Sequence, residues 1–125
     1  MKMKKAILVL FLVSLLSLTF PLVVAGGEDI PANPDSLIGS RIGGQYGVTQ
    51  IKLHWHDNSD NENYFSIERR SPKGVYREIA LVEENTKKFV DSEVSQEYGD
   101  YFYRVRAFNN AGYSEYSNEI VVSIR

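Results

Sequence analysis

From residue 35 onward, the chain consists largely of short runs in which apolar and polar residues alternate. In residues 51–56, Ile51, Leu53 and Trp55 share one face of an extended chain, and polar residues share the other. A period of two is typical of a strand with one buried and one solvated face. Five further runs, some of them shorter, are strand candidates: residues 65–68, 79–82, 88–90, 101–108 and 120–124. No window places apolar residues at helical spacing, so this part of the chain predicts no helix.

Turn-forming residues separate these runs at short, fairly regular intervals. About seven short strands arranged in this way predict an antiparallel β-sandwich. We expect its core to contain the inward-facing residues of three runs: Ile51, Leu53, Trp55, Phe65, Ile67, Tyr101, Tyr103 and Val105. Trp55 should make the largest single contribution, with its indole N–H hydrogen-bonded to a partner.

The first 25 residues have the organisation of a secretory signal peptide. A basic start, Met1–Lys5, precedes an apolar run, and Pro21 then stands before Val23-Val24-Ala25, a small-residue cleavage site. This predicts a signal helix over residues 1–25, a linker at 26–34 and a domain at 35–125. The alternative is an uncleaved anchor, since residues 6–25 carry no charge and are long enough to span a bilayer. Both interpretations export the domain, and only the second brings it to a membrane.

Composition narrows the class of partner. Without the three lysines of residues 1–25, 11 basic residues face 16 acidic ones, which gives the remaining 100 residues a net charge of −5. That charge argues against nucleic acid or an anionic membrane as a partner. The chain has no Cys, so it has no disulfides, Cys-ligated zinc or thiol nucleophile. One hundred residues suffice for one domain with a modest core.

Four motifs in order carry a family resemblance. They are Trp55-His56-Asp57-Asn58-Ser59, residues 61–69 (NENYFSIER), residues 101–107 (YFYRVRA) and residues 109–119 (NNAGYSEYSNE). Together they resemble the B strand and its loop, strand C, strand F, and the F–G turn with strand G of a fibronectin type III domain. The resemblance covers residues 31–125 and implies an immunoglobulin-like sandwich of seven strands. Strands A, B and E form one sheet of that fold, and C′, C, F and G form the other.

The resemblance also implies a role for Tyr101. It would be the tyrosine corner, whose hydroxyl bonds back to the chain before strand F. Two positions depart from the family pattern. Tyr64 stands where Gly is frequent, and residues 94–99 replace a shorter turn that contains Pro. The corner between strands E and F is therefore where the resemblance is weakest.

Two polar groups could hold a metal ion, and for each the structural interpretation is the stronger. His54 and His56 share one strand face, but the sequence fixes no third ligand for Zn²⁺. Residues 57–63 are rich in oxygen ligands, yet they lack the Gly and the flanking helices of an EF-hand. We expect two solvated imidazoles and an ordinary B–C loop, and no metal or other cofactor.

A strip of arginines and tyrosines is the candidate binding surface. Arg104 and Arg106 share the outer face of one predicted strand, and Tyr113 and Tyr116 lie just across the next turn. We expect guanidinium groups stacked on tyrosine rings in a short cation–π ladder. The residues 113–117 (YSEYS) also resemble the aromatic-Ser repeat of cytokine-receptor sandwiches, with Tyr for Trp. The alternative is an exposed strip that stacks on sugars or docks a protein, with Asn109 and Asn110 of the turn beside it.

Aromatic residues are numerous, and five are expected to be exposed: Tyr46, Tyr64, Tyr98, Phe102 and Phe108.

No nucleophile elbow or phosphate loop occurs, so the sequence does not predict an enzyme. We expect a secreted, monomeric, non-catalytic module that contacts an extracellular protein or acts as a spacer. The alternative is a carbohydrate-binding module that uses exposed Tyr and Arg. The partner, protein or polysaccharide, is not identified by the sequence.

Overall fold

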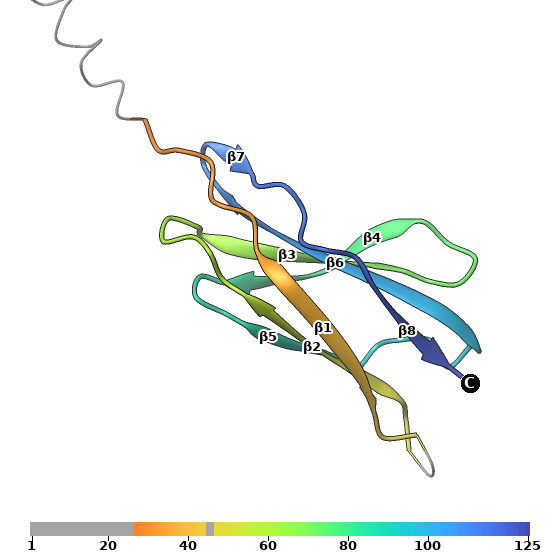
Figure 1. The fold of residues 1–125 in the computed structure, drawn as a ribbon. Helices are drawn as coiled ribbons and strands as arrows, with labels where there is room; N and C mark the ends of the chain where they lie inside the picture. Colours follow the sequence, from red (N-terminus) through yellow and green to blue (C-terminus); the bar gives the residue numbers. More distant parts are fainter. Residues whose placement is uncertain (1–26, 45–46) are drawn as a thin grey trace, which may run out of the picture.

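A computed structural model describes residues 27–44 and 47–125 of the chain (Figure 1). The predicted signal peptide, residues 1–25, and Tyr46 lie outside the described residues. These described residues form eight strands: β1 (Asp35–Ile42), β2 (Gln50–His56), β3 (Tyr64–Arg70), β4 (Tyr76–Glu83), β5 (Lys88–Asp91), β6 (Gly99–Asn109), β7 (Gly112–Tyr113) and β8 (Ile120–Ile124). In the described part of the chain, no helix has the length and apolar character needed to cross a membrane.

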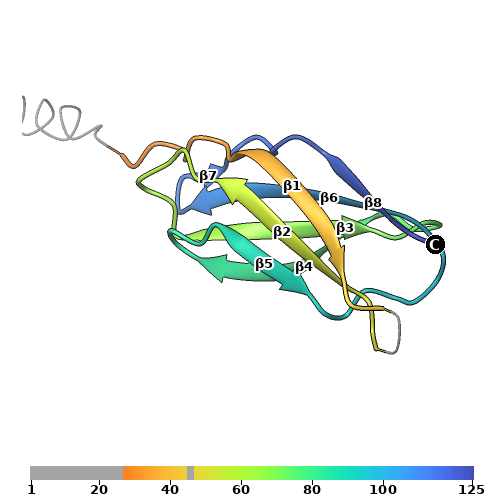
Figure 2. The same cartoon turned by 60° about the horizontal axis from the view of Figure 1, so that its bottom comes forward.

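The strands form two antiparallel sheets that face each other (Figure 2). One sheet has the order β1-β2-β5, and the other has β4-β3-β6 with both β7 and β8 paired to β6. These sheets correspond to A-B-E and C′-C-F-G, so the predicted sandwich is confirmed. The predicted run at residues 120–124 is β8, and strand G of the resemblance corresponds to β7 and β8 together. Between these two strands, the hydroxyls of Ser114 and Ser117 take the place of backbone carbonyls as acceptors for N–H groups of β6.

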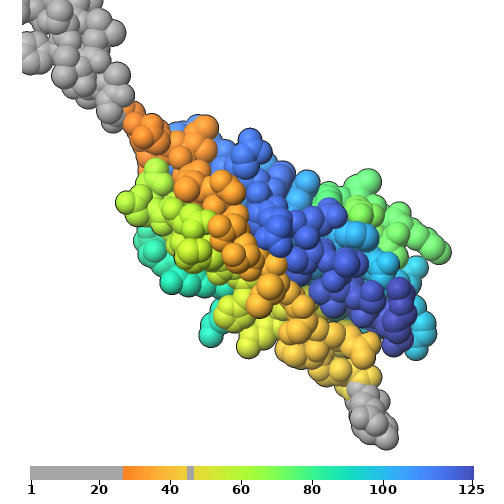
Figure 3. Space-filling model, viewed as in Figure 1, coloured from red at the N-terminus to blue at the C-terminus, as the bar shows by residue number. Residues whose placement is uncertain are grey.

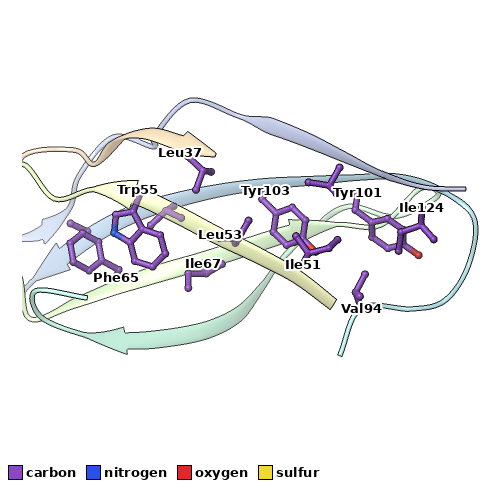
Figure 4. Close-up of a cluster of buried hydrophobic side chains, with 13 residues drawn as sticks. Leu37, Ile51, Leu53, Trp55, Phe65, Ile67, Val94, Tyr101, Tyr103 and Ile124 are labelled. Atoms are coloured by element: carbon purple, nitrogen blue, oxygen red, sulfur yellow. The ribbon is translucent and has the colours of Figure 1, made fainter. Parts of the chain in front are cut away.

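The core lies between the sheets and contains thirteen buried hydrophobic residues (Figure 4). All eight residues expected in the core are among them. Five further core residues were not among those expected. Four lie in strands β1, β6 and β8, and one lies in the loop after β5: Leu37, Ala107, Val122, Ile124 and Val94. Each fully buried aliphatic or aromatic side chain of this size contributes about 1.5–3 kcal/mol, so packing alone can hold a domain without disulfides.

Trp55 departs from expectation in one respect. Its ring packs against Phe65 at 5.6 Å between centroids and is 4% exposed, but its indole N–H has no hydrogen-bond partner among the described residues. The expectation that this N–H finds a partner is therefore wrong. The reason is that Trp55 points from the inner face of β2 into an apolar layer. An unpaired buried donor costs about 1–3 kcal/mol.

The tyrosine corner forms as the resemblance implied. Tyr101 is fully buried, and its hydroxyl lies 2.9 Å from the carbonyl oxygen of Ser95 and 2.8 Å from that of Glu97. Gly99, at the start of β6, has a φ of 143° and faces the ring of Pro72. Only glycine adopts this backbone conformation easily, so Gly99 lets the lengthened corner turn tightly into β6.

Part of the predicted linker packs against the domain. Pro31 and Pro34 are buried, and the carbonyl oxygen of Asp29 accepts hydrogen bonds at 2.8 Å from the amides of both Asn61 and Asn109. In the space-filling view this segment (orange) lies against the loops at one end of the sandwich (Figure 3). The segment is therefore fixed to the domain by these bonds and does not swing freely.

Candidate functional site

The outer face of the five-stranded sheet carries a continuous stack of aromatic rings and guanidinium groups. We call it the ladder. It arises because β6 alternates small or apolar inner residues with large outer ones, and because β3, β4 and the segment after β7 add rings beside them. In contact order, its members are Tyr64, Phe108, Tyr113, Arg106, Tyr116, Arg104, Tyr76, Arg70 and Phe102.

Two arginines of β6 form the centre of the ladder. The Arg104 guanidinium carbon lies 3.7 Å from the ring centre of Tyr116 and 3.9 Å from that of Tyr76. The same atom of Arg106 lies 3.7 Å from Tyr113 and 4.6 Å from Tyr116. All four distances are within the range of cation–π attraction. The ladder expected from the sequence is therefore present.

The ladder extends further than the sequence indicated. Arg70 lies 3.8 Å from the ring centre of Phe102 and 5.7 Å from that of Tyr76. Arg70 is paired with Phe102 across β3 and β6, and with Tyr76 across β3 and β4. These contacts depend on the register of three strands. A register assigned from the resemblance was the one signal that could have predicted them.

The other end of the ladder is aromatic and more exposed. Tyr64 stacks on Phe108 with centroids 5.5 Å apart and ring planes 19° apart, and Phe108 contacts Tyr113 at 5.2 Å. Tyr64 and Tyr113 are 43% and 49% exposed, respectively. Phe102 and Phe108 were expected to be exposed and are instead half-buried, because ladder neighbours cover them. Tyr98 is exposed as expected.

Glu68 of β3 lies under the centre of the ladder. The alternating pattern suggested a solvated side chain, but it is buried. Its carboxylate accepts hydrogen bonds from Arg104 at 3.1 and 2.8 Å and from the Tyr116 hydroxyl at 2.6 Å, and it lies 3.7 Å from Arg106. Burial alone raises the pKa of Glu68, but the hydrogen bonds and both arginine charges outweigh it and lower the pKa. The ladder is thus centred on an ionised carboxylate.

The tyrosine hydroxyls of the ladder show the opposite effect. Burial and the hydrogen bond to Glu68 raise the pKa of Tyr116. Burial and the hydrogen bond to Glu119 likewise raise the pKa of Tyr76. Both hydroxyls therefore stay protonated and act as donors to carboxylates.

Two serines attach the ladder's tyrosine segment to β6. Ser114 bonds Ala107 twice, through its backbone N–H at 2.8 Å and through its hydroxyl oxygen, which accepts from the Ala107 N–H at 2.9 Å. Ser117 bonds Val105 in the same two ways, at 2.7 and 3.0 Å. Each serine hydroxyl replaces a backbone carbonyl, so the segment between β7 and β8 stays bonded to β6 while its register shifts.

The two asparagines of the β6–β7 turn differ. Asn109 is 5% exposed, and its side chain donates to the carbonyl oxygens of Asp29 and Asn61 and accepts from the N–H of Ala111. Its polar atoms are engaged within the fold, so it is not available as the surface residue that the sequence suggested. Asn110 is exposed at the tip of the turn.

The loop at residues 57–63 is held by its own side chains. Glu62 accepts hydrogen bonds from the Ser59 hydroxyl at 2.8 Å and from the Asn85 N–H at 3.0 Å. Asp57 accepts from the Ser59 N–H at 3.0 Å. Burial raises the pKa of Asp57. For Glu62, the hydrogen bonds that its carboxylate accepts outweigh the effect of burial, so the pKa of Glu62 is lowered. These contacts agree with the structural interpretation of the loop.

The two histidines are exposed on the outer face of β2. The Nδ1 atom of His56 lies 3.4 Å from a carboxylate oxygen of Asp35. Among residues 27–44 and 47–125, no three His, Asp or Glu side chains are grouped so that they could hold a metal ion.

A buried polar cluster lies at the open side of the sandwich, between β4 and β5. Asp91 accepts hydrogen bonds at 2.7 Å from both Arg69 and the Tyr103 hydroxyl. Burial and the bond to Asp91 raise the pKa of Tyr103. The three groups satisfy one another, and Arg69 and Asp91 also line a groove of about 550 Å³. The local pattern of the sequence gives no signal for Arg69 or Asp91, because their pairing joins the two sheets.

Comparison with protein-family models and with curated proteins gives no match. Solved structures do match. An Fn3-like protein from Clostridium thermocellum is 24% identical with a TM-score of 0.55, and the match covers 74% of this chain and 92% of that one. The FN3 domain of human collagen XX is 22% identical with a TM-score of 0.59, covering 78% and 94%. The FN1–FN3 domains of chicken CNTN1 give 18% identity and a TM-score of 0.66, covering 79% and 34%.

Proposed function

We propose that this chain, whose described residues have the fibronectin type III fold, is an exported, non-catalytic module that works by contact with a partner protein. The observation that carries the proposal is the clustering of Tyr64, Phe108 and Tyr113 at one end of the ladder. Scattered exposed aromatics are ordinary on protein surfaces, but a contiguous group of tyrosines is typical of a recognition surface.

The rest of the ladder supports a scaffold role for the same face. Arg104 and Tyr116 are engaged with each other and with Glu68, so their polar atoms are already bonded within the fold. A partner would therefore meet preordered side chains and would lose little entropy in immobilising them. Export rests on the organisation of residues 1–25, which has a basic start, an apolar run and a small-residue cleavage site.

Carbohydrate binding is the second candidate, because the free part of the Tyr113 ring could stack on a sugar. The strip suggested by the sequence offers less for this purpose than expected. Tyr116 is half-buried, its ring is contacted by two guanidinium groups and its hydroxyl is bonded to Glu68. Only the Tyr64–Tyr113 end keeps rings with substantial exposed surface.

Site-specific photocross-linking tests the proposal. A benzophenone amino acid would replace Tyr113 at the ladder end or Lys52 on the outer face of β2, in protein made from the full chain in its own cells. We expect a discrete cross-linked protein from position 113 and none from position 52. A cross-link from position 52 alone would contradict the proposal. A cross-link at 113 to polysaccharide, without protein, would favour the second candidate.

A further inference from the structure

The ladder ends at Tyr64 beside two free carboxylates. Phe108 stacks on Tyr64 from the β6 side, so the opposite ring face is directed towards β4. Directly across the β3–β4 pair from Tyr64 lies Glu83. Asn63, Tyr64, Glu83 and Glu84 line a shallow, open hollow of about 290 Å³, which we call the β3–β4 hollow.

The two glutamates of this hollow differ from the two carboxylates that bond to the ladder. Glu68 and Glu119 each accept hydrogen bonds from ladder residues. Glu83 and Glu84 are exposed, and within residues 27–44 and 47–125 their carboxylates make no hydrogen bond or ion pair. The hollow therefore combines a π-face with two unneutralised negative charges.

We propose that the β3–β4 hollow binds an arginine side chain of a partner protein, and this rests on the proposed function as a protein-contact module. The same face already contains the arrangement that such a complex would form. The Arg104 guanidinium lies 3.7 Å from the Tyr116 ring while it donates two hydrogen bonds to Glu68. The hollow brings together the same kinds of group, a tyrosine ring and carboxylates, and leaves the guanidinium to the partner.

The chemistry of the hollow favours arginine over other ligands. A guanidinium group is planar and weakly hydrated, so it can stack on a ring and bond carboxylates at once, whereas the ammonium of lysine is a strongly hydrated point charge. A neutral sugar could stack on Tyr64, but it would leave the two negative charges uncompensated. The net charge of −5 over residues 26–125 also attracts cationic partners.

An NMR titration tests the proposal with a defined probe. Isotope-labelled protein made from the full chain would be titrated at low ionic strength with the capped peptide Gly-Arg-Gly-Arg-Gly. The control peptide carries citrulline, which has the shape of arginine without its charge. We expect amide shifts concentrated at residues 63–64 and 83–84, and binding at least about fivefold weaker for the citrulline peptide.

Matched variants distinguish binding of the peptide at the hollow from a general attraction to the net negative charge of the protein. The double variant Glu83→Gln/Glu84→Gln should weaken peptide binding about fivefold or more. The control Glu93→Gln/Glu97→Gln removes the same charge from the corner before β6, at the other end of that strand from Phe108 and Tyr64. We expect the control to weaken binding less than about twofold, because distant exposed charges are screened. Tyr64→Leu should also weaken binding while leaving the thermal midpoint close to that of the parent.

Three outcomes would overturn the proposal. They are equal binding of the citrulline peptide, shifts confined to other residues, and perturbation of the hollow by a neutral hexasaccharide but not by the arginine peptide. Each leaves the proposed function standing if the cross-link from position 113 to a protein is still obtained. Peptide binding at the hollow without any protein cross-link from position 113 would instead support the arginine site and contradict the proposed function as a protein-contact module.

Discussion

Tyr116 donates a hydrogen bond from its hydroxyl to the carboxylate of Glu68 at 2.6 Å, across the outer face of the five-stranded sheet. The bond links the segment between β7 and β8 to the middle of β3. Arg104 completes the arrangement, since it stacks on the Tyr116 ring and also bonds Glu68. A buried carboxylate, a phenol and a guanidinium therefore fix three parts of the sheet relative to one another.

Removing the charge of Glu68 should destabilise the domain. Glu68→Gln keeps the size of the side chain but loses the ion pair with Arg104 and weakens the bond from Tyr116. We expect the free energy of unfolding to fall by about 1–3 kcal/mol, measured by urea denaturation. Glu93→Gln, at an exposed position, is the control and should change it by less than about 0.5 kcal/mol. Equal effects of the two substitutions would show that Glu68 does not hold the ladder.

The contribution of Glu68 should also depend on pH. Its pKa in the folded protein lies below the ordinary value of 4.5, so the folded state favours the ionised form. This stabilisation is fully present above pH 4.5 and is lost as the pH falls through the lower pKa of the folded state. The difference in unfolding free energy between the parent and Glu68→Gln should therefore be constant near neutrality and shrink below about pH 4.5. A difference that grows on acidification would contradict the assigned direction.

The two serines of the segment between β7 and β8 give a separate test. In Ser114→Ala, the N–H of the buried residue Ala107 loses its acceptor, and in Ser117→Ala the N–H of Val105 does. We expect each variant to lose about 1–2 kcal/mol of unfolding free energy. Ser92→Ala, at an exposed position after β5, should be nearly neutral. Faster exchange of the Ala107 and Val105 amide protons in the respective variants would locate the effect, and unchanged exchange would argue against it.

The sequence predicts the parts of the ladder that are close along the chain. Arg104, Arg106, Tyr113 and Tyr116 belong to one hairpin, so a period of two and a short turn are enough to bring them together. Arg70 and Tyr76 join the ladder through the pairing of β3 with β4 and β6. Alternation alone leaves register open, and a shift of one residue would turn both side chains to the other face.

Burial of polar residues was the harder part to predict. Glu68 occupies an outward position, and a period-two pattern assigns such positions to solvent. It is buried because long arginine and tyrosine side chains from neighbouring strands lie over it. Asn109 is buried for a similar reason, since Asp29 and Ile30 lie against the turn that contains it. In both cases the covering atoms come from segments that are distant in the sequence, so the local alternation of apolar and polar residues does not predict the burial.

Trp55 provides the sharpest test of the core. Its large buried ring stabilises the folded state, whereas its unpaired indole N–H destabilises it. Trp55→Ala removes a large buried ring and should cost about 3–5 kcal/mol of unfolding free energy. Trp55→Phe keeps an aromatic ring against Phe65 and removes the indole N–H that has no partner. The smaller ring leaves some space, but the unpaired donor is gone, so we expect a loss of about 1 kcal/mol or less. Trp55 is the only Trp in the sequence, so unfolding should be followed by circular dichroism. If Trp55→Phe costs as much as Trp55→Ala, the indole N–H is bonded in solution and its assignment as unpaired is wrong.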